Sequence, residues 1–468
     1  PQFQEIQVKF ISTRGEAPPV GFVDACLSGL APDGGLYVPE RWPTIAPARP
    51  DEPYVSVASR VISAFAEEEL PESTVQGLCE RAYANFAHQS VAPLVQWGPN
   101  RFIMELHHGP TLAFKDVAMQ LIAQLFDEVL TARGQRMSVT CATSGDTGGA
   151  AAAAFAGASQ VDLFILHPFE RVSPVQRLFM TTTGASNVHN IAIDDDFDVC
   201  QAIVKSLFAD RDFVKSSNLS GVNSINWARI AAQAVYYATA QAAMGADRPL
   251  RFIVPSGNMG DALAGYVAAR CGLMAGFEAV CAVNENDTLN VLFGEGRMLR
   301  RPARATPSPA MDISVPSNFE RLAFEVSGRD AEMLRRVYEQ FAQSGDVELP
   351  DRIKGPLGCS GLSAASVSNA QTLAEMRQVL GETGWLICPH TAVGTHAARN
   401  LNSDGETVDI VLATAHAAKF PETVEEATGR NCPLPERVAG LTGRTEVFEK
   451  LSSEASVVRD FIEKNRRR

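Results

Sequence analysis

Between about residues 101 and 419, short runs of β-branched and aliphatic residues alternate with longer amphipathic stretches. This alternation is typical of α/β proteins, in which helices cover a mainly parallel sheet. Gly, Pro, Asp or Ser residues bound the short runs, which predicts that the strands end there. The predicted strands are residues 136–142, 161–167, 188–193, 250–255, 277–283, 385–388 and 408–413.

The helix predicted after Lys115 has the clearest periodicity. Apolar residues recur every four positions from Val117 to Val129, so they form one apolar stripe. Asp116 stands at the start of this helix, where a carboxylate interacts favourably with the helix dipole. Lys115 is therefore predicted to lie at a junction between a loop and a helix.

The regions outside the alternating pattern differ from it. Residues 1–95 combine Pro-rich breaks with helical runs, which predicts an N-terminal packing domain. Segment 297–318 is rich in proline and poor in periodic apolar residues, so we expect a surface loop. The chain closes with a loop, a helix and the basic residues 466–468, which we expect to be a solvated tail.

Composition narrows the class of protein. The chain has 468 residues, of which 46% are hydrophobic and 20% are charged, as in a soluble globular protein of two or three domains. A net charge of −13 disfavours a nucleic-acid binder or an anionic-membrane binder. The predicted partner is a small molecule, and an anionic one must be bound by helix N-termini and single arginines. The pattern leaves open whether the protein is a monomer or a homodimer.

Cysteine and histidine usage point to a reduced protein without a metal. The nine cysteines include no CxxC pair and lie mostly in apolar runs, which indicates a cytoplasmic protein. The first residues lack the pattern of a signal peptide, and no segment is long enough to span a membrane. His390, His396 and His416 do not have the spacing of a common metal site, so we assign no metal.

Lys115 follows the apolar residues Leu112, Ala113 and Phe114. An amine in such surroundings loses hydration, which disfavours its ammonium form and makes it a better nucleophile. Lys115 is therefore a candidate for condensation with an aldehyde. The ordinary alternative is an exposed lysine that pairs locally with Asp116.

Residues 143–149 connect a predicted strand to an alanine-rich helix. Glycines in such a loop let backbone N–H groups converge on an anion, and the hydroxyl groups of Ser144 and Thr147 add donors around Gly145 and Asp146. The loop is neither a GxGxxG loop nor a Walker loop. It suits a carboxylate or a phosphate, although an ordinary capped turn has the same residue types.

A second glycine-rich loop follows the strand predicted at 250–255 and opens another helix. Its backbone amides can bind an anion if the carboxylate of Asp261 points away. Two anion loops indicate a ligand with two anionic ends, or two ligands. The loop residues are Ser256, Gly257, Asn258, Met259, Gly260 and Asp261.

Two further places offer polar groups to a ligand. Ser224 or Asn226 can cap a long helix, and Arg229 lies about one turn into that helix, where it could bind a phosphate. A surface arginine in a local ion pair is the simpler reading of Arg229. Thr414 follows the last predicted strand, at a strand end where open α/β sheets bind ligands, and its hydroxyl group could meet a heterocyclic nitrogen.

Taken together, these segments resemble the signature segments of the threonine synthase family, which are fold type II pyridoxal 5'-phosphate (PLP) enzymes. The order and spacing of the segments agree with the family. Residues 12–15 and 33–39 are similar to its longer bacterial and fungal form. The segments that carry the resemblance are 108–116, 143–148, 256–261 and 414–420.

The resemblance implies a tryptophan-synthase-β-like α/β fold, with mainly parallel sheets in a large and a smaller, mobile domain. The implied division is an N-terminal domain (1–95), a large PLP-binding domain (96–118 and 221–435), a smaller domain (119–220) and a C-terminal helical tail (436–468).

The resemblance also implies roles for the candidate residues. Lys115 would carry PLP, loop 256–261 would bind the cofactor phosphate, and Thr414 would meet the pyridine nitrogen. Ser144, Gly145 and Thr147 would receive the substrate, and Ser224, Asn226 and Arg229 would hold its phosphate. Asp146 stands where related enzymes often carry Asn near the ring oxygen of the cofactor. A carboxylate there repels a phenolate unless a proton is shared.

The expected reaction converts O-phospho-L-homoserine and water to L-threonine and phosphate, the last step of threonine biosynthesis. A threonine-synthase-like phospholyase, which would release a keto acid, and a serine or threonine dehydratase are alternatives within the same cofactor class. A nicotinamide-dependent dehydrogenase or a non-catalytic binding protein would explain the α/β pattern but not Lys115.

Overall fold

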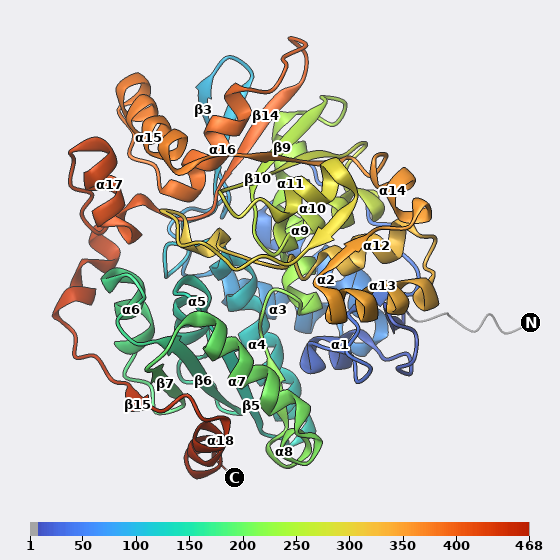
Figure 1. Cartoon of the computed structure of the whole chain (residues 1–468), viewed down its shortest axis with the longest axis vertical. Helices are drawn as coiled ribbons and strands as arrows, with labels where there is room; N and C mark the ends of the chain where they lie inside the picture. Colours follow the sequence, from blue (N-terminus) through green and yellow to red (C-terminus); the bar gives the residue numbers. More distant parts are fainter. Residues whose placement is uncertain (1–7, 468) are drawn as a thin grey trace, which may run out of the picture.

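The computed structural model describes residues 8–467. Most of its strands belong to two separate sheets of mainly parallel strands, one in the upper and one in the lower half of Figure 1, and the remaining strands form two small antiparallel pairs. One continuous hydrophobic core reaches from the N-terminal region through both halves. The first seven residues of the predicted N-terminal domain and Arg468 of the predicted tail lie outside the described residues.

The large sheet has the strand order β13-β10-β9-β14-β4-β3, in which only β3 runs antiparallel to its neighbour. Its strands are β3 (Leu94–Gly98), β4 (Arg101–Glu105), β9 (Leu250–Pro255), β10 (Glu278–Val283), β13 (Leu362–Ser366) and β14 (Val408–Ala413). The helices of this half are α9 (Trp227–Met244), α10 (Gly260–Arg270), α11 (Thr288–Glu295), α12 (Phe319–Val326), α13 (Ala331–Ser344), α14 (Asp351–Leu357), α15 (Asn369–Thr383), α16 (Pro389–Arg399) and α17 (Pro421–Thr428).

The small sheet is wholly parallel, with the order β15-β7-β6-β5-β8. Its strands are β5 (Met137–Ala142), β6 (Val161–Pro168), β7 (Val188–Ile193), β8 (Leu219–Gly221) and β15 (Glu449–Leu451). The helices of this half are α5 (Asp146–Phe155), α6 (Pro174–Thr181), α7 (Phe197–Ala209), α8 (Arg211–Ser217) and α18 (Ala455–Asn465). Helix α4 (Lys115–Arg133) contacts α9 of the large half and α5 of the small half.

The N-terminal region packs on the first turn of α9. Phe10 and Phe65 place their ring centroids 5.4 and 5.5 Å from the fully buried Trp227, which opens that helix. These contacts fix the helix start that carries Arg229. The elements of this region are β1 (Phe10–Ser12), paired antiparallel with β2 (Tyr37–Pro39), and helices α1 (Phe22–Ser28), α2 (Tyr54–Ala66) and α3 (Glu72–Tyr83).

Most of the predicted strands are confirmed, but one is wrong. The strands predicted at 188–193, 250–255 and 408–413 match at both ends, and those predicted at 136–142, 161–167 and 277–283 match within one residue. Residues 385–388 form no strand. Ile387 and its partly buried neighbour Leu386 pack against the cluster formed by α15 and α17, and the Cys388 side chain caps α16. The apolar run therefore serves packing between helices.

The C-terminal end is bound to the small half, so its interpretation as a solvated tail is wrong. Arg467 pairs with the buried Asp162 at 2.6 Å and also donates to two backbone carbonyls. Arg466 donates to the Ser216 carbonyl. Strand β15, which the sequence did not predict, adds the edge strand beside β7. The predicted loop 297–318 contains the short strand β11 (Arg297–Leu299), paired with β12 (Asp346–Glu348), and one 3₁₀ turn.

All nine cysteines are free thiols, and only Cys359 is exposed. Within residues 8–467, no helix combines the length and the apolar character needed to cross a membrane.

Candidate active site

The loop before Lys115 is held rigidly by Asp116. The Asp116 carboxylate accepts hydrogen bonds from the Thr111 backbone N–H at 2.8 Å and from the Thr111 hydroxyl group at 2.6 Å. Leu112 is fully buried with a φ of 61°, a left-handed conformation that only surrounding contacts can maintain. Gly109 lies so close that an added Cβ would stand 2.3 Å from the Asp116 Cβ. The conformation of the loop therefore fixes the position of Lys115.

We expect Gly109→Ala to disturb this loop. Because the clash involves the Cβ of a buried residue, relief requires a backbone shift that costs about 1–3 kcal/mol. Thermal unfolding of the cofactor-free protein should show the loss, and PLP binding should weaken. Gly381→Ala in α15 is the matched control, since a Cβ there meets nothing within 4 Å. Equal stability of the two variants would contradict the tight fit.

Lys115 is buried, with 9% of its surface exposed, and its Nζ lies 4.7 Å from the centroid of the Phe114 ring. Burial lowers the pKa of Lys115 to about 8, although the negative charge of Asp146 opposes this shift. The predicted loss of hydration beside an apolar shoulder is therefore confirmed. A larger fraction of this amine is therefore neutral near physiological pH than in an exposed lysine.

Asp146 lies between two lysines. Its Oδ2 is 3.6 Å from Lys115 Nζ, and its Oδ1 is 2.7 Å from the Nζ of Lys419, which is fully buried. Gln176 of α6 donates its side-chain amide to the same Oδ1 at 2.9 Å. Burial alone would raise the pKa of Asp146, but the positive charges of Lys419 and Lys115 hold that pKa well below its ordinary value. Sequence reasoning missed Lys419, although it stands inside the motif segment 414–420.

The predicted anion loop 143–149 is held by its own first residue. The Thr143 hydroxyl oxygen accepts hydrogen bonds from the backbone N–H groups of Gly145 and Gly148, each at 2.9 Å. Gly145 has a φ of 139°, which favours glycine. Ser144 and Thr147 are half-buried at the start of α5, and in the described part of the chain their hydroxyl groups bond no other residue. These hydroxyls stay available, so their contact with substrate stays a prediction.

Asp261 points away from the start of α10, as an anion site there requires. Its Oδ1 accepts hydrogen bonds from the hydroxyl groups of Tyr236 and Tyr237 on α9. Burial raises the pKa of Asp261 to about 6, against the effect of these hydrogen bonds. Met259 adopts a φ of 60° and turns the chain into α10. The Ser256 hydroxyl group is buried without a hydrogen-bond partner among residues 8–467.

The residues predicted to hold the substrate phosphate, here called the phosphate clamp (Ser224, Asn226 and Arg229), differ in whether their polar groups are already hydrogen-bonded. Arg229 is 3% exposed, and its Nε has no partner in the described part of the chain. Burial lowers the pKa of Arg229 to about 10. The Asn226 amide is instead fully used. It caps α9 and donates to the Cys26 and Gly221 carbonyls at 2.7 and 3.2 Å. Asn226 therefore holds the helix start, and its contact with substrate stays a prediction.

Ser224 and Thr414 both lie beside other parts of the site. The Ser224 hydroxyl group is 3.4 Å from that of Ser317, which donates to the Asn258 side chain at 3.1 Å. The Thr414 carbonyl accepts a hydrogen bond from the Phe114 N–H at 2.8 Å, at the end of β14. The structure thus brings the end of β14 to the Lys115 loop, and it brings Ser224 through Ser317 to the loop that follows β9. The contact of Thr414 with a ring nitrogen stays a prediction.

The residues present fit PLP. A buried amine of lowered pKa suits the aldehyde, and the N-terminus of α10 suits the phosphate because the first N–H groups of a helix lack intrahelical partners. The unpartnered Ser256 hydroxyl group and Arg229 guanidinium offer donors for the anionic groups of cofactor and substrate. Within the described residues, no cluster of three metal-ligating side chains occurs.

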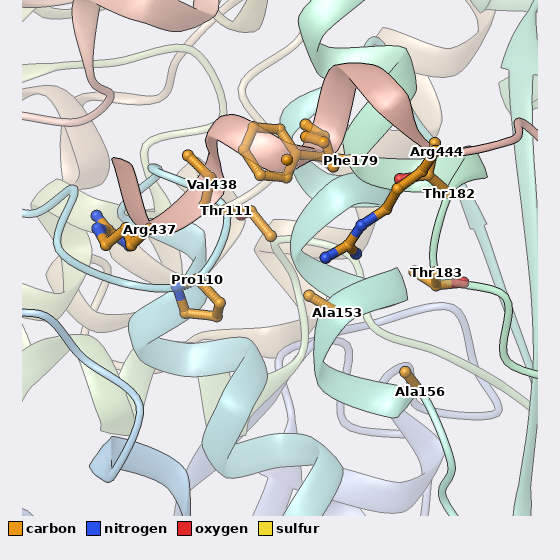
Figure 2. A pocket seen from close by; sticks show the side chains of 12 residues that line it. Pro110, Thr111, Ala153, Ala156, Phe179, Thr182, Thr183, Arg437, Val438 and Arg444 are labelled. Carbon is orange, nitrogen blue, oxygen red and sulfur yellow. The ribbon is translucent and has the colours of Figure 1, made fainter. Parts of the chain in front are cut away.

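A separate cavity of about 330 Å³ lies beside the loop that precedes Lys115, between α5, α6 and residues 436–444 (Figure 2). Thr111 and Phe179 line it, but neither Lys115 nor Thr414 does. It is therefore not the site of the cofactor.

Sequence profiles of known families match three parts of the chain. Residues 9–83 match "Threonine synthase N terminus", residues 93–344 match "Pyridoxal-phosphate dependent enzyme", and residues 391–462 match "Threonine synthase, C-terminal".

Individual relatives match almost the whole chain. The threonine synthase of Pseudomonas aeruginosa is 42% identical, covering 97% of this chain and 98% of its own. The crystal structure of PLP-bound threonine synthase from Brucella melitensis superposes with a TM-score of 0.93 at 45% identity, covering 99% of this chain and 100% of its own. The yeast threonine synthase structure reaches 0.90 at 34% identity, covering 98% and 99%. These matches confirm the fold class and the cofactor. The chain belongs to the threonine synthase family of PLP-dependent enzymes.

Proposed function

We propose that the protein converts O-phospho-L-homoserine and water to L-threonine and phosphate, as a lyase that acts on a carbon–oxygen bond to phosphate. The observation that carries this proposal is that one site holds both a buried amine, Lys115, and a buried guanidinium, Arg229. Within residues 8–467, the Arg229 guanidinium has no ion-pair partner. The amine suits the cofactor, and the cation suits a substrate that brings its own phosphate.

The side chains divide the work of the reaction. Bound PLP supplies an electron sink for negative charge at the substrate carbons. Lys115 Nζ, released by the substrate amine, would remove the α-proton and then shuttle a β-proton, so that the γ-phosphate can leave and the γ-carbon regains a proton. The Arg229 guanidinium and the hydroxyl groups of Ser144 and Thr147 bind the γ-phosphate and stabilise its charge as it leaves. Water then adds at the β-carbon.

The halves that carry these groups meet around the site. Asp146 and Gln176 come from the small half, whereas Thr414 and Lys419 follow the last strand of the large half. A closing motion of the small half would exclude bulk water from Lys115 and Arg229 while the phosphate leaves.

Product analysis tests the reaction directly. The purified enzyme should release phosphate and L-threonine from O-phospho-L-homoserine in equal amounts. Release of phosphate with 2-oxobutyrate would instead identify a phospholyase. Turnover of free threonine as fast as the phosphorylated substrate would identify a dehydratase.

Arg229→Gln should weaken transition-state binding of the phosphorylated substrate. Loss of charge-assisted hydrogen bonds costs about 1.5–3 kcal/mol each, which corresponds to a fall in kcat/KM of roughly 10- to 100-fold. Inhibition by inorganic phosphate should weaken in parallel, while the bound-cofactor spectrum stays unchanged. Arg248→Gln, at an exposed arginine, is the control. Unaltered kcat/KM and phosphate inhibition in Arg229→Gln would contradict the clamp.

We place the protein in the cytoplasm, since nine unpaired thiols suit a reducing compartment. Its partner is the small-molecule substrate, and the net charge of −13 supports no nucleic-acid or membrane partner.

A further inference from the structure

Lys419 is a second buried lysine in the site, and the reaction described above gives it no step. It ends the 3₁₀ turn Ala417–Lys419 that follows β14, and its side chain is 0% exposed. Its Nζ contacts Asp146 Oδ1 at 2.7 Å, donates to the Thr111 carbonyl at 2.8 Å and lies 5.1 Å from the centroid of the Phe179 ring. These contacts hold Lys419 as an ammonium ion.

The two lysines that face Asp146 are held very differently. Asp146 Oδ1 is already shared by Lys419 and Gln176, at 2.7 and 2.9 Å. Asp146 Oδ2 lies 3.6 Å from Lys115 Nζ, which is too far for a hydrogen bond of normal length. Within residues 8–467, Lys115 Nζ makes no hydrogen bond of normal length. Asp146 therefore forms its close ion pair with Lys419 and lies opposite Lys115 without a hydrogen bond of normal length.

Burial is the largest influence on the form of the Lys115 amine, and the charges around it modify that influence. Asp146 attracts the ammonium form, whereas Lys419 and Arg229 repel it. His390 is neutral at physiological pH, because burial lowers its pKa to about 4. Without Lys419, Asp146 would be a buried carboxylate with Lys115 as its nearest cation. The charged or titratable groups that face Lys115 are Asp146, Lys419, Arg229, His390 and Asp261.

We propose that Lys419 is a positioning residue for the Lys115 amine: by occupying Asp146, it stops that carboxylate from holding Lys115 as an ammonium ion. The neutral amine can then add to the PLP aldehyde. A carbon–nitrogen bond forms, and the aldehyde oxygen leaves as water with both amine protons. The same ion pair explains which lysine reacts, since the protonated Lys419 has no free electron pair. The inference rests on the role of Lys115 proposed above.

The ion pair between Lys419 and Asp146 is buried away from water. Thr111 and Phe179 contact Lys419 and also line the cavity shown in Figure 2, and the Lys419 side chain itself is 0% exposed. Exclusion of water strengthens the attraction between Lys419 and Asp146 and also the repulsion between the two lysines.

The test mixes the cofactor-free, full-length protein with PLP at a series of pH values. The rate of PLP capture is measured from the visible absorption of the lysine-bound cofactor. Wild-type capture should rise with a midpoint of about 8, because only the neutral amine reacts. Lys419→Met should move this midpoint upward by about one unit or more. At a pH below the midpoint, capture should then be roughly tenfold slower, because the neutral fraction of Lys115 falls tenfold per unit.

Three further variants separate this role from a purely structural one. Asp146→Asn should lower the midpoint, and adding Lys419→Met to Asp146→Asn should raise it again, because the addition removes one like charge in a background without the carboxylate. Lys450→Met, which removes an exposed lysine paired with Asp194, should leave the midpoint unchanged. A lysine that served only stability would change the amount of folded protein and not the midpoint.

The outcomes are distinguishable. A wild-type midpoint near the ordinary lysine value of 10.5 would overturn the proposed role of Lys115 itself. A wild-type midpoint of about 8 that Lys419→Met leaves in place, in both backgrounds, would overturn only the inference about Lys419. An upward shift that is larger in the wild-type background than in Asp146→Asn supports it, because only the wild type has the carboxylate that Lys419 occupies. An equal shift in both backgrounds would leave only like-charge repulsion and would overturn it.

Discussion

Lys115→Ala is expected to lower kcat by about 10⁴-fold or more, the largest loss of activity of any single substitution in this protein. The substitution removes both the covalent tether of the cofactor and the base that moves protons at the substrate carbons. Lys419 cannot replace it, because Asp146 and the Thr111 carbonyl hold that lysine as an ammonium ion. Steady-state turnover of O-phospho-L-homoserine measures the effect.

The same variant should lose the visible absorption of the lysine-bound cofactor while keeping its fold. Burial of Lys115 costs free energy because the site disfavours its charge, so the alanine variant should unfold at a temperature no lower than the cofactor-free wild type. Lys450→Ala is the control for removal of an exposed lysine. Retention of the absorption band, or of more than about 1% of the activity, would contradict the role of Lys115.

Asp146→Ala is expected to give the largest loss of stability, about 3–5 kcal/mol in the free energy of unfolding. The substitution leaves Lys419 as a buried charge without its counter-ion, at a side chain that is 0% exposed. The double variant Asp146→Asn with Lys419→Met keeps similar volumes without charge and should regain most of this loss. Denaturant unfolding of the cofactor-free proteins measures both. Equal stability of Asp146→Ala and wild type would contradict a buried, ionised pair.

The pH dependence of stability gives a second view of this pair. Because the folded-state pKa of Asp146 is depressed below its ordinary value of 3.8, its stabilisation is fully present above that pH and is lost as the pH falls further. Wild-type stability should therefore decline more steeply on acidification below about pH 4 than that of the uncharged double variant. Parallel declines would show that Asp146 does not contribute through its charge.

The sequence was sufficient for the strands with long β-branched runs. It missed the three-residue strands β8 and β15, since so short a strand has too few positions to show a period, and it also missed the five-residue strands β3, β4 and β13 of the large sheet. It misassigned residues 385–388 because an apolar run between glycine and proline can cover helices as well as join a sheet. It also missed the binding of the basic end, because the partner of Arg467 is Asp162, far away in the chain.

The candidate site shows the same limit at the level of side chains. Lys115 was found from its apolar neighbours in the chain. Lys419 was not, because its importance lies in the distant Asp146 and Thr111. Asn226 caps α9, which confirms one of the two caps predicted from the sequence, and the packing adds that its amide is fully used. The sequence presents the polar groups, and only the packing shows which of them remain available.

The most direct test of the cofactor site is chemical. Purified enzyme with PLP bound would be reduced with sodium borohydride, which fixes the cofactor to the nitrogen that carries it, and then digested and mapped by peptide mass. We expect the cofactor on the peptide that contains Lys115 and none on the peptide that contains Lys419. Cofactor on Lys419, or on neither lysine, would contradict the proposal that Lys115 is the amine of this enzyme.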